Sequence, residues 1–406
     1  MTDLNLPEQS YPVLILKPNE DRRLRAGHLW IYSNEIDVTT SPLKSFAAGQ
    51  QVVVKNSRGK LMGLAYVNPH SLICARLFSR DVNHPLDKSL FVHRLNIALS
   101  LREGMTDQPY YRLVYGDSDF LPGLVVDRFG DILVVQIATA GMEQVKELLV
   151  EALCKVLKPN GILFKNDSRI RRAEELPEYV EVAFGEVPEW VDIKENNVLF
   201  SVPVYQGQKT GWFYDHRASR ARLEHYVKGK RVLDVFSYIG GWGVQAAVFG
   251  AESVSCVDSS EFALDAVEKN AELNNVREKV ATIHGSAFDV MKVLIDEGER
   301  FDVIIMDPPA FIPRRKDIKS GEQAYRRVNE LAIRLLSKAG VLVSASCSMH
   351  LGRERLNDIL RASARHLDRD IQILEQGGQT FDHPVHPAIV ETEYLKAVFA
   401  RVLPAS

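Results

Sequence analysis

A short apolar strand that runs through an acidic residue into a glycine-rich turn constrains the fold of this chain most strongly. The segment VLDVFSYIGGWG covers residues 232–243 and holds Asp234 within its strand. Its turn contains three glycines, Gly240, Gly241 and Gly243. Two further apolar strands end in acidic residues, at Asp258 and Asp307. Strands that alternate with helices through to Leu403 predict a doubly wound, mostly parallel α/β sheet.

Length and composition predict more than one domain. The chain has 406 residues, of which 46% are hydrophobic and 25% are charged, and this is too long for one typical core. It contains no apolar run of about 18 residues, and its first thirty residues lack the pattern of a signal peptide. We therefore expect a cytoplasmic protein with no membrane partner. Four widely scattered cysteines argue against a zinc site and a disulfide framework, and we expect no bound metal.

The N-terminal part predicts a small β-barrel, which we place at residues 1–82. Short strands with intervening turn residues occur at 13–16, 51–55, 61–67 and 72–78. Residues 1–100 contain 12 Lys and Arg against 8 Asp and Glu, whereas residues 101–200 contain 11 against 18. This basic excess is compatible with an RNA-binding module, although a charged surface is more often simply a solvated face.

A small α+β domain is predicted at residues 83–180. Helix-like spacing of apolar residues at 86–103 precedes strands at 111–115, 124–129 and 132–137, a helix at about 142–157 and a last strand near 161–165. An acidic stretch with spaced prolines predicts a linker at about 173–188. The sheet domain then covers residues 181–406.

The cofactor is predicted to bind where the parallel strands end. Asp258 follows Asp234 by 24 residues and suits the hydroxyl groups of a ribose. The dinucleotide pattern G-x-G-x-x-G is absent, and S-adenosylmethionine is favoured because carboxylates complement its positive sulfonium. For the glycines alone, a tight strand-to-helix connection is the alternative. The predicted cofactor-binding residues are Asp234, Phe236, Ser237, Tyr238, Gly240, Gly241, Asp258, Ser259, Ser286, Ala287, Asp307 and Gln208.

Two parts of this set leave alternatives open. Ser286 stands where an Asp would commonly hold the amino group of adenine, and either Asp289 or the main chain could take that role. Gln208 and Lys209 could line the cofactor or RNA pocket, or simply form a polar hairpin tip.

Cys347 is the predicted catalytic nucleophile. It ends the apolar strand 341–348 between two serines, and a cysteine at a strand end lies on the ligand side of such a sheet. Carbon-5 methylation of a pyrimidine needs a thiolate that adds to the neighbouring carbon. Asp307, in a loop stiffened by Pro308 and Pro309, is predicted to hydrogen-bond the ring nitrogen if burial keeps its carboxyl partly protonated. The residue that removes the carbon-5 proton is not identified by the sequence.

With these residues in hand, the chain resembles the PUA-domain-containing 23S rRNA cytosine-5 methyltransferases, of the large-subunit methyltransferase I type. The resemblance is carried by segments 28–32, 116–130 and 208–217, by Asp307-Pro308-Pro309 and Ser346-Cys347-Ser348, and by Asp382-His383-Pro384-Val385. It implies a PUA RNA-binding barrel, a small EEHEE-type middle domain and a class I methyltransferase domain that forms 5-methylcytosine in 23S rRNA. It also implies Asp307 and Cys347 as catalytic residues.

The chain departs from this resemblance at Ser286 and at His216, where such families often show Gln. His383 is better interpreted as a satisfied loop histidine than as a catalytic one. Three other functions stay open: methylation of an exocyclic amine through Asp307 and Phe311, a non-catalytic RNA-binding or assembly protein, and a nicotinamide enzyme. A homodimer is also compatible with the sequence.

Overall fold

The computed structural model describes residues 11–405, whose contacts form two compact units. The first unit contains the chain as far as Val191, together with Pro203–Trp212 and Phe381–Thr392. The second unit contains Asp192–Val202, Phe213–Thr380 and the chain from Glu393 onward. Residues 1–10 of the predicted barrel domain lie outside the described residues. In the described part, no helix has the length and apolarity needed to cross a membrane.

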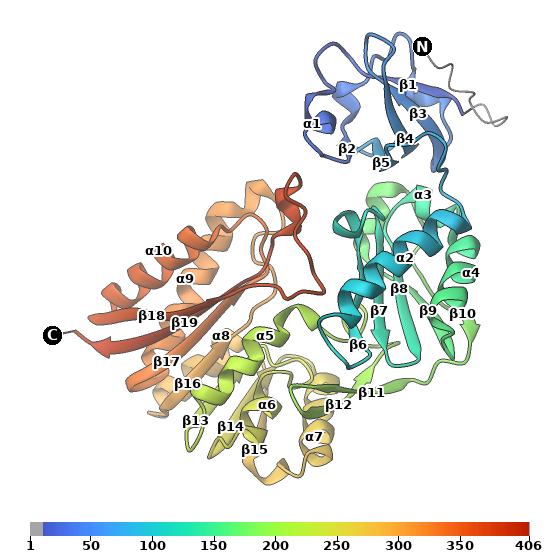
Figure 1. The fold of residues 1–406 in the computed structure, drawn as a ribbon. Coiled ribbons are helices and arrows are strands. Elements are labelled where there is room, and N and C mark those ends of the chain that lie inside the picture. The colour runs from blue at the N-terminus through green and yellow to red at the C-terminus, as the bar shows by residue number, and fades with distance from the viewer. Residues whose placement is uncertain (1–10, 406) are drawn as a thin grey trace. The chain divides into compact units, whose positions relative to one another are not determined.

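The N-terminal part of the first unit is a five-stranded sheet, drawn in blue in Figure 1. Its strand order is β1 (Val13–Ile15), β3 (Gln50–Lys55), β4 (Leu61–Val67), β5 (Ala75–Ser79) and β2 (Trp30–Ile31), and α1 spans Arg22–Arg25. The β1–β3 pair is parallel and the other pairs are antiparallel. Alternate strand residues such as Val52, Val54 and Leu77 are buried in its core.

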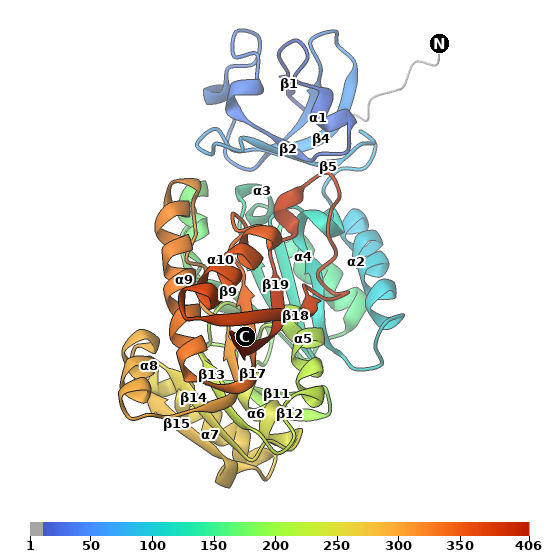
Figure 2. The ribbon, with the colours of Figure 1, turned by 90° about the vertical axis from the view of Figure 1, so that its left-hand side faces the viewer.

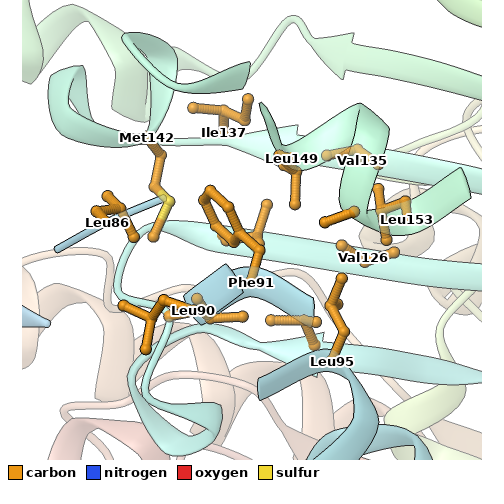
Figure 3. Packing of buried hydrophobic residues seen from close by; sticks show 14 of the residues in the cluster. Leu86, Leu90, Phe91, Leu95, Val126, Val135, Ile137, Met142, Leu149 and Leu153 are labelled. Carbon is orange, nitrogen blue, oxygen red and sulfur yellow. The ribbon is translucent and has the colours of Figure 1, made fainter. Parts of the chain in front are cut away.

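The second sheet of the first unit has the order β10 (Tyr179–Gly185), β9 (Gly161–Asn166), β8 (Ile132–Ile137), β7 (Leu124–Phe129) and β6 (Tyr110–Tyr115). Helices α2 (Lys88–Glu103), α3 (Ala140–Glu143) and α4 (Lys146–Leu157) accompany it. Figure 3 shows Phe91 of α2 among apolar side chains of β7, β8 and α4. Leu64 and Tyr66 of β4 belong to the same buried cluster, so the two sheets of this unit share one core.

The stretch predicted as a linker at 173–188 contains a strand instead. Strand β10 pairs antiparallel with β9 from Tyr179 to Gly185 and crosses the predicted domain boundary at residue 180. Most of its side chains are exposed, so its sequence carries no buried face that a pattern could reveal. The pairing of its main chain with β9 is what makes it a strand.

The second unit is built on a seven-stranded sheet. Its order is β15 (Val280–His284), β14 (Ser253–Asp258), β13 (Arg231–Val235), β16 (Phe301–Met306), β17 (Leu336–Ser346), β19 (Lys396–Pro404) and β18 (Arg369–Gly377). Only β19 runs antiparallel to its neighbours. The chain proceeds outward from β13 through β14 and β15, and then returns to the other side of β13 with β16. This reversal forms a crevice at the carboxyl ends of β13 and β16, where such sheets bind ligands.

Helices cover the seven-stranded sheet in two groups. Helix α9 (Ile318–Leu335) contacts both α8 (Ala287–Asp296) and α10 (Arg353–His366), and α9 and α10 lie side by side in Figure 2. Their apolar side chains pack on strand residues such as Leu233, Ile304 and Leu342. Helices α6 (Gly243–Val248) and α7 (Glu261–Leu273) form the other group. The second unit also contains the short helix α5 (Arg217–Ala221) and strand β12 (Val198–Pro203), which pairs with β11 (Trp190–Glu195). The predicted fold class is confirmed.

The segment Phe381–Thr392 joins the first unit through buried polar contacts. The main-chain amide of Arg112 donates to Asp382 Oδ2 at 3.0 Å, and Arg102 donates to the Asp382 carbonyl at 3.1 Å. Arg102 is fully buried and also binds both carboxylate oxygens of Asp119 at 2.7 Å. A buried arginine needs such partners, because an unpaired buried charge is costly.

Candidate active site

Asp234 lies at the centre of the second unit, one residue before the end of β13. Its side chain is completely buried, and its Oδ2 accepts a hydrogen bond from the Gly243 amide at 2.8 Å. Burial raises the pKa of Asp234 to about 8; the Gly243 hydrogen bond opposes this shift, and the charge of Asp307 adds to it. A buried acid of this kind favours a positively charged or hydrogen-donating ligand.

The loop between β13 and α6 takes an unusual backbone path. Phe236, Tyr238 and Gly240 all have positive φ, at 66°, 48° and 86°. A Cβ on Gly243 would lie 2.5 Å from Cys256 Sγ and 3.0 Å from Asp234 Oδ2, so only glycine lets α6 begin this close to the strands. Gly241 is buried in the same loop. The loop therefore brings main-chain groups and a helix start to the crevice.

Asp258 ends β14 with its carboxylate held in place. Oδ2 accepts the Tyr238 amide at 2.9 Å, and Oδ1 accepts the Ser260 amide at 3.0 Å. Each carboxylate oxygen keeps further lone-pair capacity. Ser259, the next residue, is exposed. This arrangement suits a fixed acceptor for the hydroxyl groups of a ribose.

Two buried polar atoms of β13 and the loop that follows it have no hydrogen-bond partner among the described residues. They are Asp234 Oδ1, in the strand, and Ser237 Oγ, in the loop. Buried polar atoms are normally hydrogen-bonded, and exceptions point to a missing ligand or water. Together with the carboxylate of Asp258, these atoms fit the cationic amino-acid part and the ribose of S-adenosylmethionine.

Ser286 and Ala287 stand at the start of α8, after β15. Ser286 is exposed, and its carbonyl accepts the Asp289 amide at 3.0 Å. The exposed Asp289 carboxylate contacts Lys292 Nζ at 3.0 Å. Strand β15 ends at His284, and α8 begins at Ala287, so Asp289 lies in the first turn of this helix. Asp289 is held by a partner on its own helix.

Asp307 follows β16 and lies between two nitrogen groups. His216 Nε2 lies 3.2 Å from Oδ1, and the Trp242 indole N–H donates to Oδ2 at 3.0 Å. Burial acts to raise the pKa of Asp307, but His216 and Trp242 outweigh it, so the pKa is lowered. The expectation that burial keeps this carboxyl partly protonated is wrong, because His216 and Trp242 stabilise its ionised form. The sequence does not show that His216 lies beside Asp307.

Cys347 lies one residue beyond the end of β17 and is partly exposed. Its thiol faces the Pro308 carbonyl at 4.0 Å, which puts it beside the Asp307 loop. The two neighbouring serines anchor it, since Ser346 Oγ and Ser348 Oγ lie 2.9 Å and 2.8 Å from the hydroxyl of buried Tyr325. The second unit thus brings Cys347, Asp307 and Asp234 to the same rim of one sheet.

Lys396 stands behind the Cys347 turn. It lies opposite Ser346 in the β17–β19 pair, and its Nζ donates to the carbonyls of Ser348 at 2.7 Å and Tyr394 at 2.8 Å. Burial lowers its pKa to about 8, and the charge of Cys347 acts in the opposite direction. Nothing in the sequence pattern separates this lysine from a surface lysine, so it was missed as a site residue.

The predicted residue Gln208 belongs to the first unit, as does His383, whereas the other predicted site residues belong to the second unit. Gln208 is exposed, and its carbonyl accepts the Gly211 amide at 2.8 Å, so it lies in a turn between β12 and the next element rather than at a hairpin tip. His383 is buried with its Nδ1 2.9 Å from Asp382 Oδ1. Within residues 11–405, no group of three or more His, Cys, Asp or Glu side chains is arranged to hold a metal ion.

The sheet order, the acid-and-glycine loop and the acid at the end of β14 together define a class I methyltransferase. Residues 169–397 match the family described as S-adenosylmethionine-dependent methyltransferase, and residues 14–80 match the PUA-like domain. S-adenosylmethionine is therefore the cofactor. The structure of SMU.776 complexed with S-adenosylhomocysteine has the same fold, with a TM-score of 0.83 at 21% identity over 96% of this chain and 100% of that chain.

Sequence relatives narrow the class. Ribosomal RNA large subunit methyltransferase I of Aliivibrio fischeri is 36% identical over 395 residues, which cover 96% of this chain and 99% of that protein. The protein of the same name in Vibrio cholerae is 36% identical over 399 residues, covering 97% and 100%. The chain belongs to the ribosomal RNA large subunit methyltransferase I family.

Proposed function

We propose that this protein methylates carbon 5 of a cytosine in large-subunit (23S) rRNA, in the cytoplasm, through a covalent bond between Cys347 and the pyrimidine ring. The name of the relatives supports the rRNA substrate. The position of the Cys347 thiol, 4.0 Å from the Pro308 carbonyl in the loop that begins with Asp307, carries the choice of carbon-5 chemistry. The PUA-like residues 14–80 are assigned to RNA contact.

Under this proposal, different parts of the chain bind RNA, bind the cofactor and carry out the reaction. Residues 1–82 and 83–180 bind and orient RNA, and residues 181–406 carry the chemistry. S-adenosylmethionine supplies an electrophilic methyl group when bound. Asp234, Ser237 and Asp258 hold and orient it, while Phe236, Tyr238 and the loop glycines provide main-chain contacts. The target base leaves its stack to reach the site, as enzymes acting on a base require.

Cys347 supplies what carbon 5 lacks. Its thiolate adds to carbon 6, and the ring becomes an enamine whose carbon 5 is nucleophilic. The anchored turn Ser346-Cys347-Ser348 fixes the direction of attack, because Tyr325 holds the serines on both sides. Asp307 faces the polar edge of the base and interacts with the ring nitrogen.

A second candidate is methylation of an exocyclic amine. The lowered pKa of Asp307 favours it, because an ionised carboxylate accepts a hydrogen bond from an amino group. Phe311, partly buried in the same loop, offers a ring on which a base could stack. This chemistry does not need a thiol.

The Cys347→Ala variant separates the two candidates. Incubation of the purified variant with unmodified 23S rRNA and S-adenosylmethionine, followed by nucleoside mass spectrometry, is expected to yield no 5-methylcytidine. Full methylation by this variant, or a product methylated on nitrogen, would overturn the proposal. Cys154→Ala is the matched control, because this cysteine lies in the first unit.

Two further measurements test the proposal from other sides. RNA containing 5-fluorocytosine is expected to form a covalent adduct with the wild-type protein and none with Cys347→Ala. Calorimetry with S-adenosylmethionine is expected to show saturable binding, and its absence would favour a non-catalytic RNA-binding or assembly protein.

A further inference from the structure

His216 and Asp307 form a buried pair in the second unit. His216 Nε2 lies 3.2 Å from Asp307 Oδ1, with 4% of the histidine side chain and 22% of the aspartate side chain exposed. The His216 ring also packs edge-on against Trp242, with ring centres 5.1 Å apart. Because Trp242 donates to the other oxygen of Asp307, both carboxylate oxygens face a nitrogen group.

The groups around this pair have partners of their own. Asp215, beside His216, accepts a hydrogen bond from the Tyr394 hydroxyl. Arg220 binds Glu195 through two contacts of 2.6 Å and 3.0 Å. Asp234, which interacts electrostatically with Asp307, accepts a hydrogen bond from the Gly243 amide. Neither ring nitrogen of His216 makes an aligned hydrogen bond with the described residues, so the 3.2 Å contact between Nε2 and Asp307 Oδ1 is an ion pair.

The electrostatics assign one proton to the pair. Burial alone would lower the pKa of His216, but Asp307 and then Asp215 offset this, against the opposing charge of Arg220, and the pKa is raised. The same contact lowers the pKa of Asp307. Of the two groups, the imidazole therefore holds the proton more strongly than the carboxyl.

Cysteine addition to a cytosine requires a proton at the ring. As Sγ bonds to carbon 6, the C5=C6 electron pair moves to the C4–C5 bond and the C4=N3 pair moves onto N3, which must take up a proton. An isolated Asp has an ordinary pKa of about 3.9 and seldom carries a proton at pH 7. Asp307 by itself is therefore a poor donor for this step.

We propose that His216 is a positioning residue that stores this proton for Asp307 and returns it when needed. The Nε2–H bond of His216 breaks as the Asp307 carboxylate takes the proton, and Asp307 passes it to N3 as the Sγ–C6 bond forms. The step converts thiolate, imidazolium and carboxylate into thioether, neutral imidazole and carboxylate, so charge and atoms balance. This role rests on the proposed carbon-5 chemistry.

The pH profile of His216→Gln tests the proposal. The glutamine side chain has a similar length and keeps a hydrogen-bond donor, but it cannot take up or release a proton in this pH range. The ratio of variant to wild-type methyl transfer is expected to fall by about tenfold or more between pH 5 and pH 7, because a carboxyl alone loses its proton at lower pH than the pair. A ratio of variant to wild-type rate that stays constant with pH would overturn the proposal.

His383→Gln is the matched control. His383 is also a buried histidine beside a carboxylate, with Nδ1 2.9 Å from Asp382 Oδ1, but it belongs to the first unit. Any loss of activity in this variant is expected to be the same at every pH. A pH-dependent loss equal to that of His216→Gln would show that the effect is not specific to the His216–Asp307 pair and would overturn the proposal.

Nuclear magnetic resonance of the ring nitrogens reports on the pair without RNA. The signals that disappear in His216→Gln identify the His216 ring. In the wild-type protein at pH 7, we expect these signals to be those of a doubly protonated imidazole. In Asp307→Asn, we expect the His216 signals to be those of a neutral ring. A neutral His216 in the wild type would overturn the proposal. If Cys347→Ala retains full methylation, the proposed function fails, while this measurement still reports the state of the pair.

Discussion

The Asp234 carboxylate and the Gly243 amide are joined by a 2.8 Å hydrogen bond that closes the loop between β13 and α6. This bond ties the buried acid to the first residue of the helix that follows. The geometry leaves no room for a side chain at Gly243, because a Cβ would lie 2.5 Å from Cys256 Sγ. The loop that meets the cofactor is therefore set by one acid and one glycine.

Gly243→Ala is expected to disturb this loop. Overpacking of a tight interior typically costs about 1–3 kcal/mol, and the helix start would have to move away from Asp234. We expect a lower midpoint in urea unfolding and weaker S-adenosylmethionine binding in calorimetry. Gly352→Ala is the control, because nothing lies within 4 Å of a Cβ at that position. Equal behaviour of the two variants would contradict the role of Gly243.

Cofactor binding is expected to release a proton from Asp234. Its pKa of about 8 means that the acid is mostly protonated at pH 7, and a bound cation favours the ionised form. The affinity for S-adenosylmethionine should therefore increase between about pH 6 and 7.5, by up to about tenfold per pH unit. Calorimetry in two buffers of different ionisation enthalpy measures the released proton. Asp234→Asn should bind more weakly and without this pH dependence.

The stability of the ligand-free protein should depend on the same residue. Because the pKa of Asp234 is raised from about 3.9 in the unfolded chain to about 8, its contribution to folding is fully present at low pH. That contribution is lost progressively as the pH rises from about 4 to about 8. We expect the melting temperature to fall over this range, and to fall less in Asp234→Asn. A parallel decline in both proteins would exclude Asp234 as the cause.

Lys396 is expected to promote the reactivity of Cys347. Its ammonium is fixed by the Ser348 carbonyl at 2.7 Å, and its charge interacts with that of the thiolate. Replacement by methionine removes this charge, so we expect iodoacetamide to alkylate Cys347 several-fold to about tenfold more slowly at pH 7. Peptide mass spectrometry follows this one cysteine. Lys396→Arg keeps the charge and should stay nearer to the wild-type rate; an unchanged rate in Lys396→Met would count against the effect.

The shared core of the first unit offers a test of its stability. Phe91 is completely buried among the side chains shown in Figure 3, and its replacement by alanine should destabilise this unit by about 3–5 kcal/mol. Ile97 lies on the same helix with 55% of its surface exposed, so Ile97→Ala should change stability by about 0.5 kcal/mol or less. Urea unfolding followed by hydrogen exchange of α2 distinguishes the two.

The strands that carry the site could be predicted from the sequence because each is an apolar run followed by a polar residue. The rule that parallel strands share a direction predicts that Asp234, Asp258 and Asp307 lie on one rim. The exposed strand β10 has no such run, so its sequence has the character of a linker.

Contacts between distant residues were not predictable from local patterns. His216 and Asp307 are 91 positions apart, and only the folded sheet brings them to 3.2 Å. The same holds for Lys396 and the Cys347 turn. These contacts decide which acid is ionised, so the predicted protonation of Asp307 was the part of the site that the sequence could not supply.

The first unit draws its parts from three separate stretches of chain, the last of which is Phe381–Thr392. The partners of Asp382, buried Arg102 and Arg112, are synthesised some 270 residues or more before it. During its synthesis, the first unit therefore cannot complete its core until almost the entire chain has been made. A fragment that stops short of this stretch would lack a native partner for its arginines, so the two units cannot be separated by a single cut.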